Sequence, residues 1–179
     1  MNVIFAGLLA IATTATAGSA GQSSDYVVMK NGSVETFYGV PKTLKLSDVR
    51  SLPFPHKEGA ESGGEGTTLR TAIISGRNNV KITVVFDRRG QSVEVKTASR
   101  QARDPRGVKV GDKLSHVQKV WPEGKLYYGA SIEGGRPYAI FMTGTNVILD
   151  LSDNVHDMKR APSRVRVEEI KIVGYKATL

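Results

Sequence analysis

The two halves of the chain match each other at an offset of 68 residues. Lys45-Leu46-Ser47 corresponds to Lys113-Leu114-Ser115, and a proline closes the stretch after each of them, at Pro53 and Pro122. Because matched residues hold the same roles in the expected elements, the pattern indicates duplication of one supersecondary unit. We therefore predict an α+β protein of two related units, each a short helix packed on an antiparallel sheet. Further matches pair Gly39-Val40 with Gly107-Val108 and Val49 with Val117. Later in the chain the offset drifts, and residues 92–96 resemble residues 167–171.

Local patterns place the helix and the strands within each unit. Ser47 is able to cap a helix that Pro53 stops after a turn or two. In the second unit, an apolar stripe at helical spacing ends at Pro122. Asn31-Gly32, between two apolar runs, is typical of a type I′ hairpin. Period-two alternation predicts strands at 79–86, 93–95, 137–142, 146–151 and 165–173, with a β-bulge at Glu168-Glu169 where the phase slips.

Composition divides the chain into four parts. Residues 1–20 form a leader, residues 21–97 the first unit, and residues 107–179 the second unit. Residues 98–106 are polar and basic, as a boundary segment between two units would be. Within the first unit, residues 53–68 are rich in Gly, Pro, Ser and Glu, which predicts a long mobile loop.

The leader is typical of a secretory signal peptide, although no basic residue precedes its apolar run. That run extends from Val3 to Ala12, and small residues follow it. Both Ala15-Thr16-Ala17 and Gly18-Ser19-Ala20 fit the positions that a signal peptidase reads. The run is shorter than the ~20 residues that span a bilayer, so we expect no transmembrane anchor. We expect a periplasmic or secreted protein of the cell envelope, cleaved after Ala17 or Ala20.

The chain has 25 basic and 17 acidic residues, a formal net charge of +8. An exported protein with this excess meets anionic lipid head groups, lipopolysaccharide and wall polymers, so we expect no nucleic-acid partner. A role in solubility alone is the alternative reading of the charge. The chain contains no cysteine, which excludes disulfides, thiol catalysis and a lipidated cysteine.

Basic residues provide the candidate binding site. Arg100, Arg103, Arg106 and Lys109 recur at every third position around the boundary segment. Such residues bind phosphate or sulfate groups, arginine by bidentate hydrogen bonds, while a pair of solvated loops is the alternative. We predict a non-enzymatic binding or assembly module that contacts an envelope protein or an anionic envelope polymer through these residues. A second group before the last strand joins them: Lys159, Arg160, Arg164 and Arg166.

A cell-envelope hydrolase is the alternative function. Its candidate site is the cluster Asp150, Asp153, His156 and Asp157, whose oxygen and imidazole groups also suit a divalent cation. The spacing differs from an EF-hand loop, and a solvated turn explains the cluster more simply. The sequence has no HExxH, nucleophile elbow, P-loop or dinucleotide fingerprint, so no catalytic residue, metal or cofactor is predicted. Weaker alternatives are a carboxylate pair at Glu168-Glu169 and a sugar-stacking platform of Trp121, Tyr127 and Tyr128.

The stretch from Val108 to Pro122, a valine-glycine step that leads into a short capped helix, resembles a motif of small envelope proteins. It is similar to the SmpA/OmlA-type outer-membrane lipoprotein domain and to a periplasmic lipoprotein domain of unknown function. Tandem duplication of the unit also resembles the β-lactamase-inhibitor-protein superfold. These resemblances imply helices packed on an antiparallel sheet and a role in protein–protein contact. The chain differs from these families in having no lipidated cysteine, no disulfide and one short helix per unit.

Overall fold

The computed structural model describes residues 26–63, 66–130, 137–151 and 162–174. Their strands form two antiparallel sheets, one in the order β1-β2-β3 and one in the order β4-β5-β6-β7-β11-β10-β9-β8. The helical elements are η1 (Leu46–Ser51), η3 (Arg77–Asn79), α1 (Leu114–Val120) and η5 (Pro162–Arg164). The strands of the small sheet are β1 (Val27–Lys30), β2 (Ser33–Phe37) and β3 (Val40–Pro41). Those of the large sheet are β4 (His56–Ser62), β5 (Thr68–Ser75), β6 (Lys81–Phe86), β7 (Ser92–Thr97), β8 (Lys125–Ala130), β9 (Pro137–Met142), β10 (Val147–Asp150) and β11 (Glu169–Val173).

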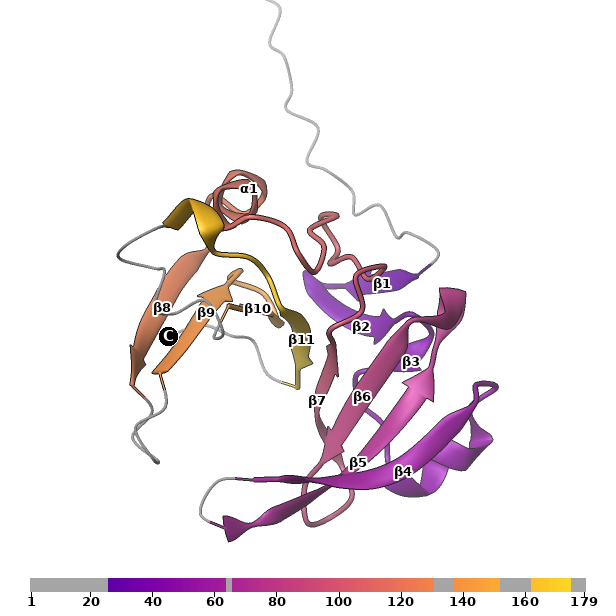
Figure 1. The fold of residues 1–179 in the computed structure, drawn as a ribbon. Helices are drawn as coiled ribbons and strands as arrows, with labels where there is room; N and C mark the ends of the chain where they lie inside the picture. The colour runs from indigo at the N-terminus through magenta and orange to yellow at the C-terminus, as the bar shows by residue number, and fades with distance from the viewer. Residues whose placement is uncertain (1–25, 64–65, 131–136, 152–161, 175–179) are drawn as a thin grey trace, which may run out of the picture.

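The large sheet bends into an arch, with β4 at one end and β8 at the other (Figure 1). The small sheet and α1 lie on the outer side of this arch. Side chains from both sheets, η1 and α1 share one hydrophobic core, which includes Phe37, Leu46, Val84, Val117 and Ile172. The core therefore lies between the outer face of the arch and the elements that cover it.

Each half of the large sheet is a four-stranded antiparallel meander that follows a helical element. η1 precedes β4 to β7, and α1 precedes β8 to β11. The two meanders meet through their last strands, where Lys96 of β7 stands opposite Lys171 of β11. One continuous sheet therefore runs through both halves of the chain.

The helical elements of the two halves are anchored by the same contact. The N–H of Leu46 donates to the carbonyl of Gly90 at 2.9 Å, and the N–H of Leu114 donates to the carbonyl of Val165 at 3.0 Å. Both leucines begin their element and are buried. The matched Gly39 and Gly107 both have positive φ, +85° and +89°. These correspondences are the ones that a duplicated unit would show.

The prediction of an α+β protein made of two helix-plus-sheet units is wrong. The described part of the chain is mostly β: α1 has seven residues, and the helical element of the first half is a six-residue 3₁₀ helix. One or two helical turns are too short to cover four strands each. A second sheet covers the large one instead, and pairing of β7 with β11 merges the two expected sheets.

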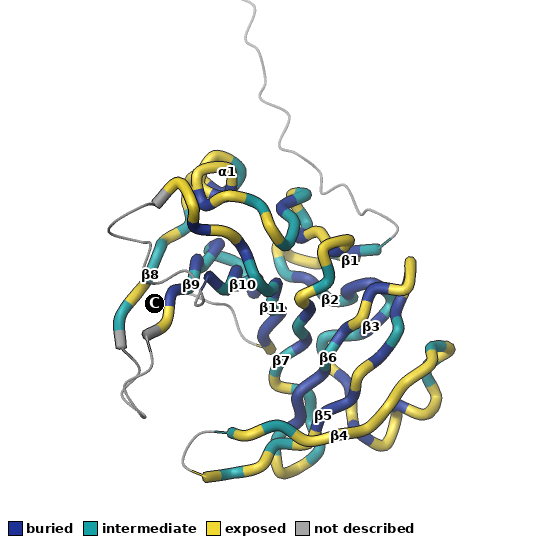
Figure 2. The backbone as a smooth tube through the Cα atoms, viewed as in Figure 1, coloured by how far each residue is buried: buried dark blue, intermediate teal, exposed yellow. Residues whose placement is uncertain are grey.

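The prediction of a loop over residues 53–68 is wrong for β4. This edge strand pairs with β5 along its whole length, from His56 opposite Ile74 to Ser62 opposite Thr68. Nearly all of its residues are exposed, as Figure 2 shows along β4. An edge strand held by backbone hydrogen bonds needs no apolar alternation, so the pattern that reveals a half-buried strand is missing.

Two other local predictions, the hairpin at Asn31-Gly32 and the ends of the short helices, are confirmed. Asn31 and Gly32 have φ of +51° and +73° in the turn that joins β1 to β2, as a type I′ hairpin requires. The short helices end before Pro53 and Pro122. No helix within the described ranges is both long and apolar enough to cross a bilayer. The leader and its cleavage sites lie outside the described residues.

Candidate anion-binding groove

An open groove of about 540 Å³ lies where η1, β4, β5 and the β6–β7 turn meet. Among the described residues, one acidic residue lines it, Glu58 of β4, against five basic ones. All five basic residues are exposed, so their charged ends are accessible to solvent. They come from three parts of the chain. Lys45 precedes η1 and Arg50 lies in its last turn, Arg70 lies on β5, and Arg88 and Arg89 lie in the β6–β7 turn.

The β6–β7 turn is shaped by its own carboxylate. Asp87 accepts hydrogen bonds from the backbone N–H groups of Arg89 and Gln91, both at 2.9 Å. Gly90 supplies the positive φ of +74° that the turn needs. Because Leu46 donates to Gly90, the turn is also fixed to the start of η1. The backbone thus holds Arg88 and Arg89 beside Lys45.

A carboxylate bridges the two arginines of the other group. Glu58 Oε1 accepts from Arg50 Nε and Nη2 at 3.4 and 3.3 Å, and Glu58 Oε2 lies 3.6 Å from Arg70 Nη2. These contacts are long, and the two arginine side chains are 79% and 65% exposed. Exposed ion pairs of this kind contribute at most about 1 kcal/mol. The bridge is therefore weak enough for a competing anion to displace.

The groove carries an uncompensated positive charge. Among the described residues, the side chains of Lys45, Arg88 and Arg89 have no carboxylate partner. Five cations face one carboxylate, whereas a surface adapted only for solubility intersperses the two signs. Like charges that line one groove repel one another, and a bound anion relieves this repulsion. The arrangement suits a ligand with several negative charges.

In the second half, the described strands have the same framework without the arginine–glutamate bridge. Lys113 holds the place of Lys45 at the start of α1. Leu126 stands in the place of Glu58, and Ala139 in the place of Arg70. This follows from the residues that stand opposite one another, strand by strand, outward from the β7–β11 junction. They are Val95, Val84, Ala72 and Glu58 in one half, and Ile170, Leu149, Phe141 and Leu126 in the other. The same order of strands therefore forms with apolar residues at the positions of Glu58 and Arg70.

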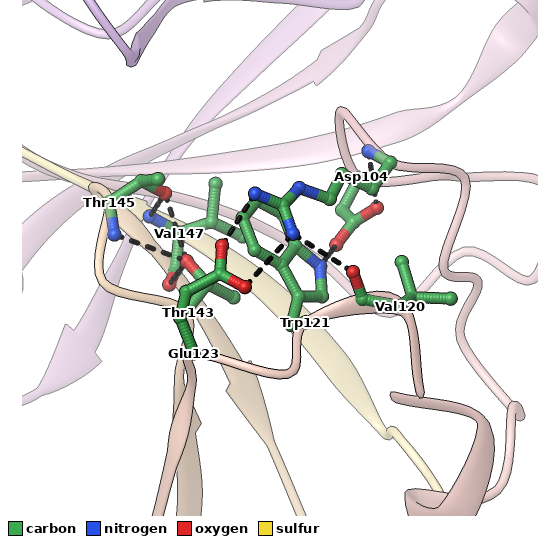
Figure 3. A network of polar contacts seen from close by, with 8 residues as sticks. Asp104, Val120, Trp121, Glu123, Thr143, Thr145 and Val147 are labelled. Atoms are coloured by element: carbon green, nitrogen blue, oxygen red, sulfur yellow. Dashed lines mark hydrogen bonds and ion pairs between the residues drawn. The ribbon is translucent and has the colours of Figure 1, made fainter. Parts of the chain in front are cut away.

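Arg106, one of the predicted binding residues, is engaged within the fold. Its guanidinium lies 3.8 Å from the centre of the Trp121 ring and donates to the Val120 carbonyl at 2.9 Å. It also forms an ion pair with Glu123, and this hydrogen bond lowers the pKa of that carboxyl. Figure 3 shows Trp121, Val120 and Glu123 in this network. The buried Trp121 is a core residue here, which leaves no sugar-stacking platform at its ring.

Of the remaining predicted binding residues, the structure brings Arg103 and Lys109 together, as partners in an isolated antiparallel β-bridge. Arg100, Arg103 and Arg164 are exposed, and Lys109 is half-buried. The backbone N–H of Arg103 donates to the Tyr38 hydroxyl at 2.9 Å, and the side chain of Arg166 donates to the Gly111 carbonyl at 3.1 Å. Lys159 and Arg160 lie outside the described residues. The contact role of these residues stays a prediction.

The cluster predicted for a hydrolase is described only at Asp150, since Asp153, His156 and Asp157 lie outside the described residues. Asp150 forms an ion pair with Lys171 at the β7–β11 junction. Burial alone would lower the pKa of Lys171, but Asp150, Glu94 and Glu169 raise it above its usual value. Burial raises the pKa of Glu169. In the part of the chain that the structure describes, no three acidic or histidine side chains are placed to hold a metal ion.

The sequence shows the parts of the groove but not their convergence. Asp87-Arg88-Arg89-Gly90 is visible as a tight turn, and Arg50 as the end of a short helix. Glu58 and Arg70 lie on strands, one of which has no strand pattern. The signal that was missed is a pair of adjacent arginines at the tip of a turn.

Comparisons with known proteins do not assign a family. No protein-family model matches the chain, and no curated protein matches it. Among solved structures, the uncharacterized Escherichia coli protein YfeY is similar, with a TM-score of 0.48 and 13% sequence identity. The match covers 83% of this chain and 95% of the YfeY chain.

Proposed function

We propose that this protein is an exported, non-enzymatic binding module that holds an anionic envelope polymer in the groove between η1, β4, β5 and the β6–β7 turn. The observation that supports this proposal is the convergence of five basic side chains from three chain segments around one carboxylate. Such a surface attracts a polyanion electrostatically at each of these basic side chains. A polymer fits an open groove better than a small molecule does, because small-molecule sites are enclosed and mostly apolar.

The leader supports export. Its apolar run and the small residues up to Ala20 match the requirements of signal peptidase. Sequencing the N-terminus of protein recovered from an exporting host should find the chain beginning after Ala17 or Ala20. Retention of Met1 on the exported protein would contradict this part of the proposal.

The binding proposal is tested with a charge-matched pair of triple variants. Lys45→Ala, Arg88→Ala and Arg89→Ala together remove the groove cations that have no carboxylate partner among the described residues. Arg100→Ala, Arg103→Ala and Arg164→Ala remove the same charge from exposed sites of the predicted contact surface. Titration with fluorescent linear polyphosphate should show at least about tenfold weaker binding for the groove variant, a loss of about 1.4 kcal/mol, and little change for the other.

Salt and folding provide the controls. Binding by the unmodified protein should weaken as salt rises, because the Debye length falls from ~10 Å at 0.1 M to ~3 Å at 1 M. Both variants should keep the thermal unfolding midpoint of the unmodified protein, since exposed substitutions usually change stability by ~0.5 kcal/mol or less. Equal losses in the two variants would indicate attraction to net charge only. A loss confined to the second variant would move the site to the boundary arginines.

A further inference from the structure

The basic side chains of the groove fall into two groups along η1. Lys45, Arg88 and Arg89 gather at the start of this helix, where Leu46 and Gly90 are hydrogen-bonded. Arg50 and Arg70 gather around Glu58 near its end. Lys45 and Arg50 are five positions apart along this element, which at roughly 2 Å per residue places their backbones about 10 Å apart.

The second group already holds an anion, which is the carboxylate of Glu58. One of its oxygens faces Arg50 and the other faces Arg70, so the carboxylate bridges two guanidinium groups. A phosphate group within a chain makes the same kind of bridge, because it also offers two free oxygens and one negative charge. Glu58 therefore occupies the position that an anionic group of a ligand would take at this end of the groove.

We infer that the groove takes a chain that bears phosphate groups in series, and that Glu58 stands in for one of those groups until the chain displaces it. The inference rests on the proposed function and specifies the ligand of the same site. One inorganic phosphate, with a charge of roughly −2, cannot pair with all five cations of the groove, whereas a phosphate chain contacts both groups at once. The first group is free to bind the chain initially, and the second binds it only after Arg50 and Arg70 leave Glu58.

Replacement of Glu58 by its neutral isostere tests this displacement. Glu58→Gln removes the internal competitor and frees Arg50 and Arg70, so linear polyphosphate should bind about fivefold tighter or more. Inorganic phosphate measures binding at a single group, and its affinity at the first group should stay unchanged. The matched control is Glu123→Gln, which also adds one positive charge and frees an arginine, Arg106, outside the groove lining. It should leave polyphosphate binding unchanged.

A second variant keeps the outcome interpretable. Arg50→Ala with Arg70→Ala should weaken binding of polyphosphate several-fold and leave binding of inorganic phosphate unchanged. Vesicles of phosphatidylglycerol test whether the ligand is a soluble phosphate chain or a membrane surface. Tighter binding to the vesicles than to polyphosphate would overturn the inference that the ligand is a phosphate chain. If Glu58→Gln binds polyphosphate equally or more weakly, the displacement role is wrong although the groove still binds anions. If the unmodified protein does not bind polyphosphate at all, the proposed function itself fails.

Discussion

Asp104 is 1% exposed, yet it is an acidic side chain in the segment between the two meanders. Its Oδ1 accepts from the backbone N–H groups of Arg106 and Val108 at 2.9 and 2.8 Å, and its Oδ2 accepts from Trp121 Nε1 at 2.6 Å. Burial raises the pKa of Asp104 to about 6 from 3.8, against the effect of these donors and of nearby Arg106. A single carboxylate thus fixes the loop, the end of α1 and the tryptophan.

This pKa predicts how stability depends on pH. A carboxyl with a raised folded-state pKa binds its proton more tightly when folded, so its contribution is present at pH 4 and is lost as pH rises through 6. Asp104→Asn removes this titrating group and places a side-chain amide that donates hydrogen bonds beside N–H groups that also donate. The free energy of unfolding should therefore fall by about 1–3 kcal/mol. In urea unfolding, the deficit of the variant should be about 2 kcal/mol larger at pH 4 than at pH 7. Asp48→Asn, at an exposed site, is the control, and an equal deficit at both pH values would contradict the prediction.

Among the elements, η1 and α1 have equivalent places and different geometry. Each starts at a buried leucine that is tied to the strand pair behind it, at Gly90 or at Val165. The element of the first half is a 3₁₀ helix and that of the second is an α-helix. The anchoring residue is thus retained while the helix type differs.

Truncation of either leucine should destabilise the protein to a similar extent. Leu46→Ala and Leu114→Ala each leave a cavity in the shared core, so each should cost about 2–5 kcal/mol in the free energy of unfolding. Ser47→Ala and Ser115→Ala, at the next and exposed positions, should change it by ~0.5 kcal/mol or less. Chemical denaturation of the four variants measures both effects. A leucine variant as stable as its serine control would show that its helical element does not contribute to the core.

The elements also show what the sequence is able to predict. Asn31-Gly32 and Pro53 act through their own backbone geometry, so a hairpin and a helix end were predicted correctly from them. β4 is held by backbone pairing with β5, and the side chains from His56 to Ser62 show no alternation that would predict this pairing. The continuous sheet depends on β7 meeting β11, a contact between residues more than 70 positions apart. For the same reason the groove, which needs Arg50, Arg70 and Arg89 in one place, was not predictable.

At the scale of the whole molecule, contacts beyond the large sheet also join the two halves. The side chain of Asn146 accepts from the Val34 N–H at 2.8 Å and donates to the Val34 carbonyl at 2.9 Å. Asn146 thereby extends the small sheet of the first half with an amide from the second. The Tyr38 hydroxyl accepts from the Arg103 N–H at 2.9 Å. With the β7–β11 pairing, these bonds make the halves interdependent.

The molecule should therefore unfold in one transition. Trp121 is the single tryptophan and reports on the second half, whereas far-ultraviolet circular dichroism reports on both halves. Urea curves from the two probes should coincide, as they do for a two-state unfolding protein. Asn146→Ala should lower stability by about 1–3 kcal/mol, because it leaves buried backbone groups of Val34 unpaired. Separate midpoints for the two probes would show that the halves are independent domains.

The strand order has a consequence for the speed of folding. Within each meander every strand pairs with its neighbour in sequence, so the loops that must close are short and their pairing is rapid. Docking of β7 on β11 joins distant residues and has a larger loop-closure entropy, so we expect this pairing to form last. During synthesis the first meander is complete before β11 is made, and β7 then presents an unpaired edge. Between completion of the first meander and synthesis of β11, the nascent chain is most open to pairing of its β7 edge with another copy.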